Sequence, residues 1–197
     1  MLIKDRERLE SERRMMLAGI TSLIEALEAR DPYTRGHSES VGKILIGMAA
    51  DMGASTKELE LLDIAGGLHD LGKIGVPDAI LLNPGKLTKK EFDAIKEHPV
   101  MGANILAPIE TLTDMIPIIL HHHERMDGKG YPHGLKGSQN PLWARATAVA
   151  DTYHAMTSNR SYRQGLSQEI AFQIMQDVRG TQPCPECLDI FLQWINK

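Results

Sequence analysis

The spacing of apolar side chains along the chain predicts a protein built of helices. Apolar residues return every three or four positions, and no series of alternating segments typical of strands is found. The predicted helices cover residues 2–30, 36–52, 55–71, 88–97, 99–106, 111–123 and 142–159, and two short helices close the chain. Pro117 is expected to kink the helix that contains it. The pattern therefore predicts an all-α fold with short loops.

The first predicted helix carries half of a coiled-coil pattern. Apolar residues recur every seven positions at Leu2, Leu9, Met16 and Leu23. Ile20 and Leu27 occupy the second seam position, which Arg6 and Arg13 occupy earlier. The pattern favours two interpretations equally: an amphipathic helix on the core, or a coiled-coil stalk that joins an upstream input domain and pairs with a second copy. We divide the chain into this helix or linker, residues 1–30, and a domain of residues 31–197.

Composition narrows the class of protein. The chain has 197 residues, 42% hydrophobic and 5% aromatic, which favours one domain of packed helices over a β-sandwich. The net charge of -4 argues against a protein that coats a nucleic-acid polymer. No apolar stretch reaches the roughly 18 residues of a membrane span, and the charged start lacks a signal-peptide core. A cytoplasmic location is expected.

Several histidines and carboxylates lie within or beside apolar segments. His69-Asp70 ends an apolar helix, His122-His123 follows an apolar run, and Asp151 lies within another. Burying such groups without partners is costly, and metal coordination compensates several of them at once. Imidazole suits Fe, Mn, Zn or Ni. Two cations bridged by a carboxylate can hold a phosphate and lower the pKa of a water molecule. Each element alone is more often a surface or capping residue, and only their combination is specific.

Two motifs carry more specific information. The first is His69-Asp70-Leu71-Gly72-Lys73, and the second runs from His122-His123-Glu124 through Gly128-Lys129-Gly130 to Tyr131-Pro132. Together they resemble the motifs of the HD-GYP family, a branch of the HD superfamily of metal-dependent phosphohydrolases. The resemblance also covers residues 31–37, His98-Pro99 and residues 151–163, and extends from about residue 22 to the C-terminus. It implies an HD-type helical bundle. It also implies that a metal-bridging hydroxide hydrolyses the second messenger cyclic di-GMP to linear pGpG, and in some members to GMP.

The resemblance also implies roles for individual residues. One metal would be held by His37, His69, Asp70 and Asp151, and a second by His98, His122 and His123, with Asp70 bridging the two. Asp70 and Lys73 would be catalytic. Substrate would contact Lys73, Tyr131, Arg160 and Arg163. Iron or manganese is expected from the family, and zinc, nickel and cobalt are alternatives.

The chain departs from the family pattern at two positions. Tyr33 replaces a glutamate that binds a third metal in some members, and His154 replaces a frequent aspartate. We therefore predict two metals, with pGpG as the product and GMP only if the second cleavage needs no third ion. His154 is interpreted as a packed helix residue, with ligand or outer-shell roles as alternatives. The Cys184 and Cys187 pair is interpreted as opening the last helix. His121 and His133 match no family role and are interpreted as solvent or outer-shell positions.

Two other functions remain open from the sequence. One is a binding module that senses cyclic di-GMP, or binds a partner protein, with little turnover. The other is a hydrolase of a different cyclic dinucleotide. Product formation distinguishes an enzyme from a binding module. Comparing kcat/KM across cyclic dinucleotides distinguishes a cyclic di-GMP hydrolase from a hydrolase of another substrate.

Overall fold

The computed structural model describes residues 2–30, 36–159 and 164–197, with the backbone alone at residues 2–7, 9, 10, 13 and 16. In these ranges the regular structure is helical, and the paired extended backbone is limited to one bridge between Asp127 and Lys136. The predicted all-α fold is therefore confirmed. No helix in the described ranges is long and apolar enough to cross a membrane.

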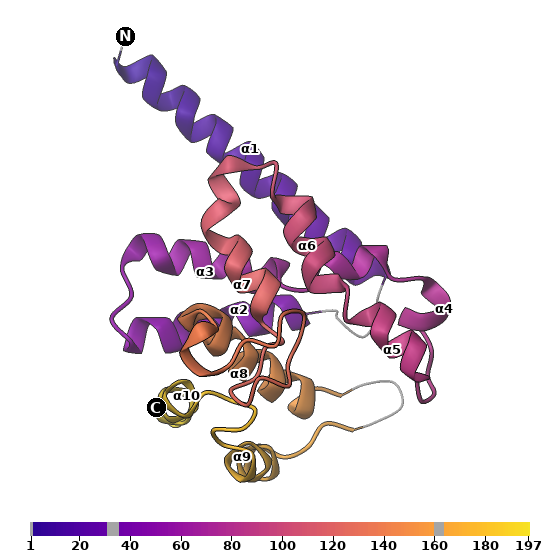
Figure 1. Ribbon diagram of the computed structural model, residues 1–197. Helices are drawn as coiled ribbons and strands as arrows, with labels where there is room; N and C mark the ends of the chain where they lie inside the picture. The colour runs from indigo at the N-terminus through magenta and orange to yellow at the C-terminus, as the bar shows by residue number, and fades with distance from the viewer. Residues whose placement is uncertain (1, 31–35, 160–163) are drawn as a thin grey trace.

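Ten α-helices and three short 3-10 segments make up the described fold (Figure 1). The α-helices are α1 (Leu2–Arg30), α2 (His37–Asp51), α3 (Thr56–Leu68), α4 (Asp78–Leu81), α5 (Lys89–Ile95), α6 (His98–Leu106), α7 (Ile116–His121), α8 (Leu142–Thr157), α9 (Gln168–Asp177) and α10 (Pro185–Ile195). The 3-10 segments are η1 (Leu71–Gly75), η2 (Glu110–Met115) and η3 (Gly137–Gln139).

Local sequence signals explain several helix ends. Ser55 and Thr88 open α3 and α5 with the reciprocal side-chain and backbone bonds of a capping box. The helix predicted over 55–71 ends at Leu68; His69 and Asp70 form a turn, and η1 begins at Leu71. The single helix predicted over 111–123 is divided beside Pro117. η2 ends at Met115 and α7 begins at Ile116, so Pro117 lies in the first turn of α7, where its missing N–H costs nothing.

The first helix is long and straight, and its N-terminal half projects beyond the other helices (Figure 1). In its second half Ile20 and Leu27 are 7% and 2% exposed and join the core, whereas Leu23 is 43% exposed. This half therefore fits the amphipathic interpretation. The side chains of Leu2, Leu9 and Met16 lie outside the described residues, and the stalk stays a prediction.

The core lies where α2, α3, α7, α8 and α10 pack together. Its fully buried large side chains include Leu45, Met48, Leu62, Leu68, Leu106, Met115, Ile119, Leu188 and Phe191. α2 and α3 approach closely because glycine faces glycine: a Cβ on Gly66 would lie 2.6 Å from the Cα of Gly42. This approach brings the first residue of α2 beside the last turn of α3.

The last helix begins at the cysteine pair. Cys184 is the residue before α10, Cys187 lies in its first turn, and both are buried free thiols. Arg145 of α8 donates a hydrogen bond to the Sγ of Cys184 at 3.1 Å. The pair therefore packs the start of α10 against α8, as interpreted from the sequence.

Candidate metal centre

Helix ends and one helix face converge on a single polar cluster inside the apolar bundle. The seven residues expected as ligands come from the start of α2 (His37), the end of α3 (His69 and Asp70), the start of α6 (His98), the end of α7 (His122 and His123) and the middle of α8 (Asp151). Five of them are buried: His37, His69, Asp70, His98 and His122. Residues more than 100 positions apart in the sequence thus share one site.

One part of the cluster surrounds His37. The Nε2 of His37 lies 3.3 Å from the Nε2 of His69 and 3.3 Å from an oxygen of Asp151. An oxygen of Asp70 lies 3.9 Å from the same nitrogen. His37, His69 and Asp70 therefore form a group whose ligand atoms could hold one ion, and Asp151 lies against it.

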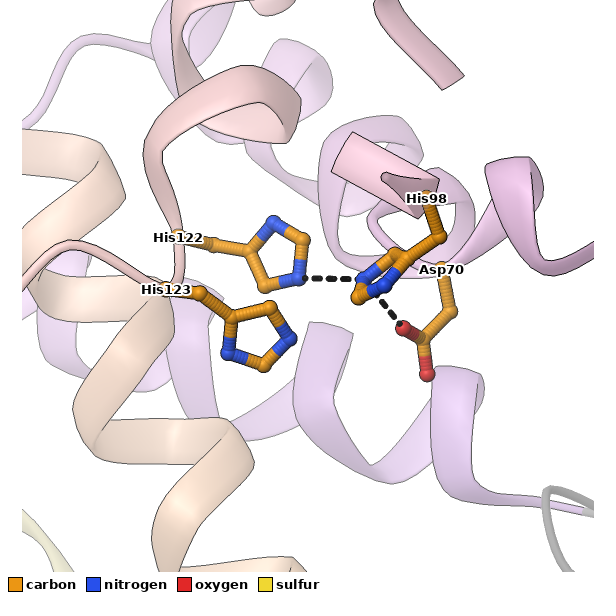
Figure 2. Close-up of side chains that lie close together, drawn as sticks. All are labelled: Asp70, His98, His122 and His123. Atoms are coloured by element: carbon orange, nitrogen blue, oxygen red, sulfur yellow. Dashed lines mark hydrogen bonds and ion pairs between the residues drawn. The ribbon is translucent and has the colours of Figure 1, made fainter. Parts of the chain in front are cut away.

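The other part of the cluster is drawn in Figure 2. The Nε2 of His98 lies between the Nε2 of His122, at 3.3 Å, and the Oδ1 of Asp70, at 3.2 Å. His123 lies beside His122, with ring centroids 4.0 Å apart. These four residues form a second group that could hold an ion, and Asp70 belongs to both groups.

Three buried histidines have their tautomer fixed by the backbone. The Nδ1 of His69, His98 and His122 contacts the carbonyl oxygen three residues earlier, at 2.7 to 2.8 Å. A carbonyl oxygen only accepts hydrogen bonds, so each Nδ1 must donate. In a neutral ring the Nε2 then presents a lone pair toward the cluster. This is the arrangement by which proteins orient a metal-ligating histidine.

The spacing of these lone pairs fits a cation. The Nε2 atoms of His98 and His122 lie 3.3 Å apart, and when both rings are neutral with Nδ1 protonated no proton lies between them. Two nitrogens about 2.1 Å from one tetrahedral ion are roughly 3.4 Å apart. The buried nitrogens are therefore spaced as ligands of a common ion, and the donor set of imidazole and carboxylate suits a divalent transition metal.

Electrostatics favour the metal-binding forms of several of these groups. Burial lowers the pKa of His69 and lowers that of His122 well below its usual value. Burial, and then the proximity of His98, lower the pKa of His123 to about 3. Burial alone would raise the pKa of Asp70, but Lys73 and then His69 outweigh it and hold that pKa well below its usual range. These directions favour neutral rings at His69, His122 and His123 beside an ionised Asp70.

Lys73 and Tyr131 lie at the edge of the cluster. The Nζ of Lys73 is 2.6 Å from the Oδ2 of Asp70, so Lys73 projects from the same face, as its spacing predicts. The ring of Tyr131 stacks on His123 at 4.7 Å, and its backbone N–H donates to the carbonyl of His123. Burial, and then the charges of Asp70 and Asp151, raise the pKa of the Tyr131 hydroxyl.

A cavity of about 360 Å³ opens beside His122, His123 and Asp151, with Tyr131 in its wall. This volume lies in the range of small-molecule sites. Three further cationic side chains line it: Lys96, Arg125 and Lys129. The sequence analysis assigned them no role, although Arg125 and Lys129 lie within the motif that ends in Tyr131-Pro132, so charge within the motif was the available signal.

His154 does more than pack within its helix. Its Nδ1 lies 2.8 Å from the Nδ1 of His37, and the two rings are 4.9 Å apart. This contact favours the alternative in which His154 orients the ring of His37. Tyr33, Arg160 and Arg163 lie outside the described residues, and their roles stay predictions.

Comparison with known proteins defines the class. A family model described as an HD domain matches residues 21–183. The chain therefore belongs to the HD domain family. Within that family it is a member of the HD-GYP branch, as its two motifs indicate.

Relatives support this assignment. A cyclic di-GMP phosphodiesterase of Thermotoga maritima is 39% identical over 98% of this chain and 53% of its own length. The cyclic di-GMP phosphodiesterase response regulator RpfG of Xanthomonas campestris is 38% identical over 88% of this chain and 47% of its own length. A solved cyclic GMP-AMP specific phosphodiesterase of Vibrio cholerae has a TM-score of 0.57 at 30% identity, over 90% of this chain and 40% of that one. The chain thus spans about half the length of the curated relatives it matches.

Proposed function

We propose that this chain is a metal-dependent phosphodiesterase that hydrolyses cyclic di-GMP. The observation that carries the proposal is the pair of ligand groups that share Asp70. In one of them the Nε2 atoms of His98 and His122 lie 3.3 Å apart inside a buried cluster. The relatives named as cyclic di-GMP phosphodiesterases support the substrate.

The residues divide naturally between two ions. His37, His69, Asp70 and Asp151 would hold the first, and Asp70, His98, His122 and His123 the second. We propose iron or manganese, because mixed imidazole and carboxylate donors suit both. When bound, the cations would supply Lewis acidity to the scissile phosphodiester and acidify a water molecule for attack near neutral pH.

The protein side chains position the reaction. The Oδ1 of Asp70 contacts His98 and its Oδ2 contacts Lys73, so one carboxylate joins both halves of the cluster. Lys73 places a positive charge beside that carboxylate, where it can neutralise charge that develops on the phosphate or the leaving group. No serine or cysteine nucleophile is required.

The cavity supports an anionic dinucleotide. Lys129 brings positive charge to its wall, where Arg125 and Lys96 are paired with Asp127 and Asp93, and stacking on His123 holds Tyr131 in place. Arg160 and Arg163 are proposed to contact the phosphates as well. We propose linear pGpG as the product, with GMP formed only if the second cleavage proceeds on two metals.

Hydrolysis is tested by incubating the metal-loaded protein with cyclic di-GMP and separating the products. We expect linear pGpG at a rate that depends on the metal. Binding without any product would instead identify a sensor or interaction module.

A second candidate substrate is cyclic GMP-AMP, because a solved relative at 30% identity is specific for it. Measuring kcat/KM for cyclic di-GMP and cyclic GMP-AMP under identical metal conditions decides between them. A higher kcat/KM for cyclic GMP-AMP would reassign the substrate.

The organisation of the chain is also a proposal. We propose that residues 1–30 link the phosphodiesterase domain, residues 31–197, to an input domain and pair with a second copy. The projecting half of α1 in Figure 1 supports this arrangement. Sedimentation over a range of concentrations should detect a dimer that is lost when residues 1–16 are removed.

A further inference from the structure

A second cluster of histidine and carboxylate side chains lies beside the metal centre and contributes no ligand to it. The cluster consists of His121, Glu124 and His133, whose ligand atoms all lie within 4.8 Å of one another. His121 ends α7, Glu124 follows the two histidines of the centre, and His133 comes just after Tyr131-Pro132. We call these three residues the loop-base cluster, because they flank the two ends of the loop formed by residues 125–132.

The cluster contains a polar atom without a partner. The Nδ1 of His121 is buried and makes no hydrogen bond, and the side chain of His121 is 14% exposed. The nearest carboxylate oxygen is the Oε1 of Glu124, 4.0 Å away, which is too far for a hydrogen bond. Buried polar atoms are nearly always paired, so this nitrogen facing a carboxylate is placed to accept a partner such as a cation.

Glu124 has acceptor capacity to spare. Its side chain is fully buried and accepts two hydrogen bonds, from the backbone N–H groups of His133 and Leu135 at 2.7 and 3.0 Å. An ionised carboxylate has about four lone-pair sites. Among the described residues no lysine or arginine forms an ion pair with Glu124, so a buried carboxylate faces the histidines with no cation beside it.

His133 completes the cluster from the solvent side. Its residue is exposed, and its ring lies 5.3 Å from that of His121 at an angle of 56°. Ligands of one tetrahedral zinc ion lie roughly 3.4 Å apart. Small rotations of His121 and of the exposed His133 would close the remaining gap, and the exposed side gives an ion a path of entry.

We propose that His121, Glu124 and His133 form a separate site for Zn²⁺ or a neighbouring divalent transition metal. Two imidazoles and one carboxylate are a recurring zinc donor set, with water in the fourth position. The set favours Zn²⁺, Co²⁺, Ni²⁺ or Cu²⁺ over the all-oxygen sites of Mg²⁺ and Ca²⁺.

An ion in this site ties together the two ends of the loop that carries Tyr131. Tyr131 already stacks on His123 and bonds its carbonyl, so the loop position and the cavity wall are linked. Occupancy therefore adds a restraint on the loop to the hydrogen bonds by which Glu124 already holds His133 and Leu135. Metal binding at this site does not depend on the proposed activity.

Zinc uptake tests the site. The chain is first saturated with Mn²⁺, and bound Zn²⁺ per chain is then measured for the wild type, for His133→Ala and for Ser138→Ala, a change at a nearby exposed residue. We expect the wild type and Ser138→Ala to bind one Zn²⁺ more than His133→Ala. The affinity lost by removing this ligand should exceed the roughly 10- to 100-fold lost with an outer-shell partner.

Zn²⁺ could also replace Mn²⁺ at the main centre, so the titration is repeated in an Asp70→Ala background as a control. The difference of one Zn²⁺ should persist there, even if the main centre no longer binds metal or turns over substrate. Equal uptake with and without His133 in both backgrounds would overturn the site.

Hydrogen exchange tests the restraint on the loop. Zn²⁺ should slow exchange of the backbone amides of residues 125–135 in the wild type and leave them unchanged in His133→Ala. Uptake of zinc with unchanged exchange in the wild type would overturn the restraint and leave the site as a binding site alone.

Discussion

Three histidines of the cluster gain their orientation from helix ends. The carbonyls that accept their Nδ1–H groups belong to Gly66, Ile95 and Ile119, in the last turns of α3, α5 and α7. Carbonyls in a last turn have no intrahelical partner. One hydrogen bond therefore satisfies a helix terminus and fixes which ring nitrogen faces the site. A histidine placed at a helix end is set up for coordination by local geometry alone.

His154 should control metal affinity through His37. Replacing it with alanine removes the 2.8 Å contact to the Nδ1 of His37, and metal affinity should fall about 10- to 100-fold while the helix content is kept. Asn places a hydrogen-bonding atom near the position of Nδ1, so His154→Asn should restore much of the affinity. Metal content after dialysis against graded chelator measures both variants. Unchanged affinity in His154→Ala would show that the contact does not support the ligand.

At the scale of elements, the close approach of η1 and α6 sets the distance between Asp70 and His98. A Cβ on Gly72 would lie 1.8 Å from the carbonyl oxygen of His98 and 2.5 Å from the backbone nitrogen of Gly102. Only glycine fits there, because both obstacles are backbone atoms that cannot rotate away. The distance between two ligands thus depends on the absence of one methyl group.

Gly72→Ala should therefore separate η1 from α6. We expect it to destabilise the fold by about 1–3 kcal/mol, as overpacking does, and to lower the bound metal per chain. Gly19→Ala is the matched control, since a Cβ at that helical position meets nothing within 4 Å. It should stabilise α1 by about 0.5–1 kcal/mol. Denaturant unfolding and metal analysis measure the pair, and a Gly72→Ala chain with normal stability and metal content would refute this account of the packing.

Arg30 bonds the end of α1 to η1 and the residues that follow it. Its guanidinium donates to the carbonyls of Lys73, Ile74 and Val76 and to the carboxylate of Asp78. The contact links the proposed signalling helix to η1, which carries Lys73. Displacement of α1 would therefore act on the residues beside Asp70.

Arg30→Ala should release this tie. We expect a loss of about 1–3 kcal/mol of stability, because three carbonyls lose a charged donor, and a lower kcat with metal content unchanged. Arg30→Lys keeps the charge but not the forked geometry and should recover only part of both. Unfolding and steady-state kinetics provide the measurements. A wild-type kcat in Arg30→Ala would show that α1 and the active site are not coupled through this residue.

The elements were largely predictable because their signals are local. Capping residues, Pro99 and Gly53 mark their helix ends within a few positions. The contacts made by Arg30 and His154 could not be predicted from local signals. Arg30 contacts residues 43 to 48 positions away, and His154 contacts a residue 117 positions away. The same limit hid the loop-base cluster, since no spacing rule brings His133 back to His121.

At the scale of the whole molecule, the fold gathers ligands that the sequence scatters. The motifs indicated which residues are expected to bind metal, through the family they resemble, but not the distances between them. Those distances follow from the packing of α2 on α3 and of η1 on α6, where glycines allow close contact.

The most direct test compares metal content and cyclic di-GMP hydrolysis in the wild type, in Asp70→Ala and in Asp63→Ala, which removes an exposed carboxylate from the same region of α3. The account predicts about two metal ions per chain and pGpG formation for the wild type and Asp63→Ala. Asp70→Ala should lose the metal of the main centre and all turnover while keeping its helical circular dichroism. An Asp70→Ala chain that still binds metal and still forms pGpG would contradict the central claim.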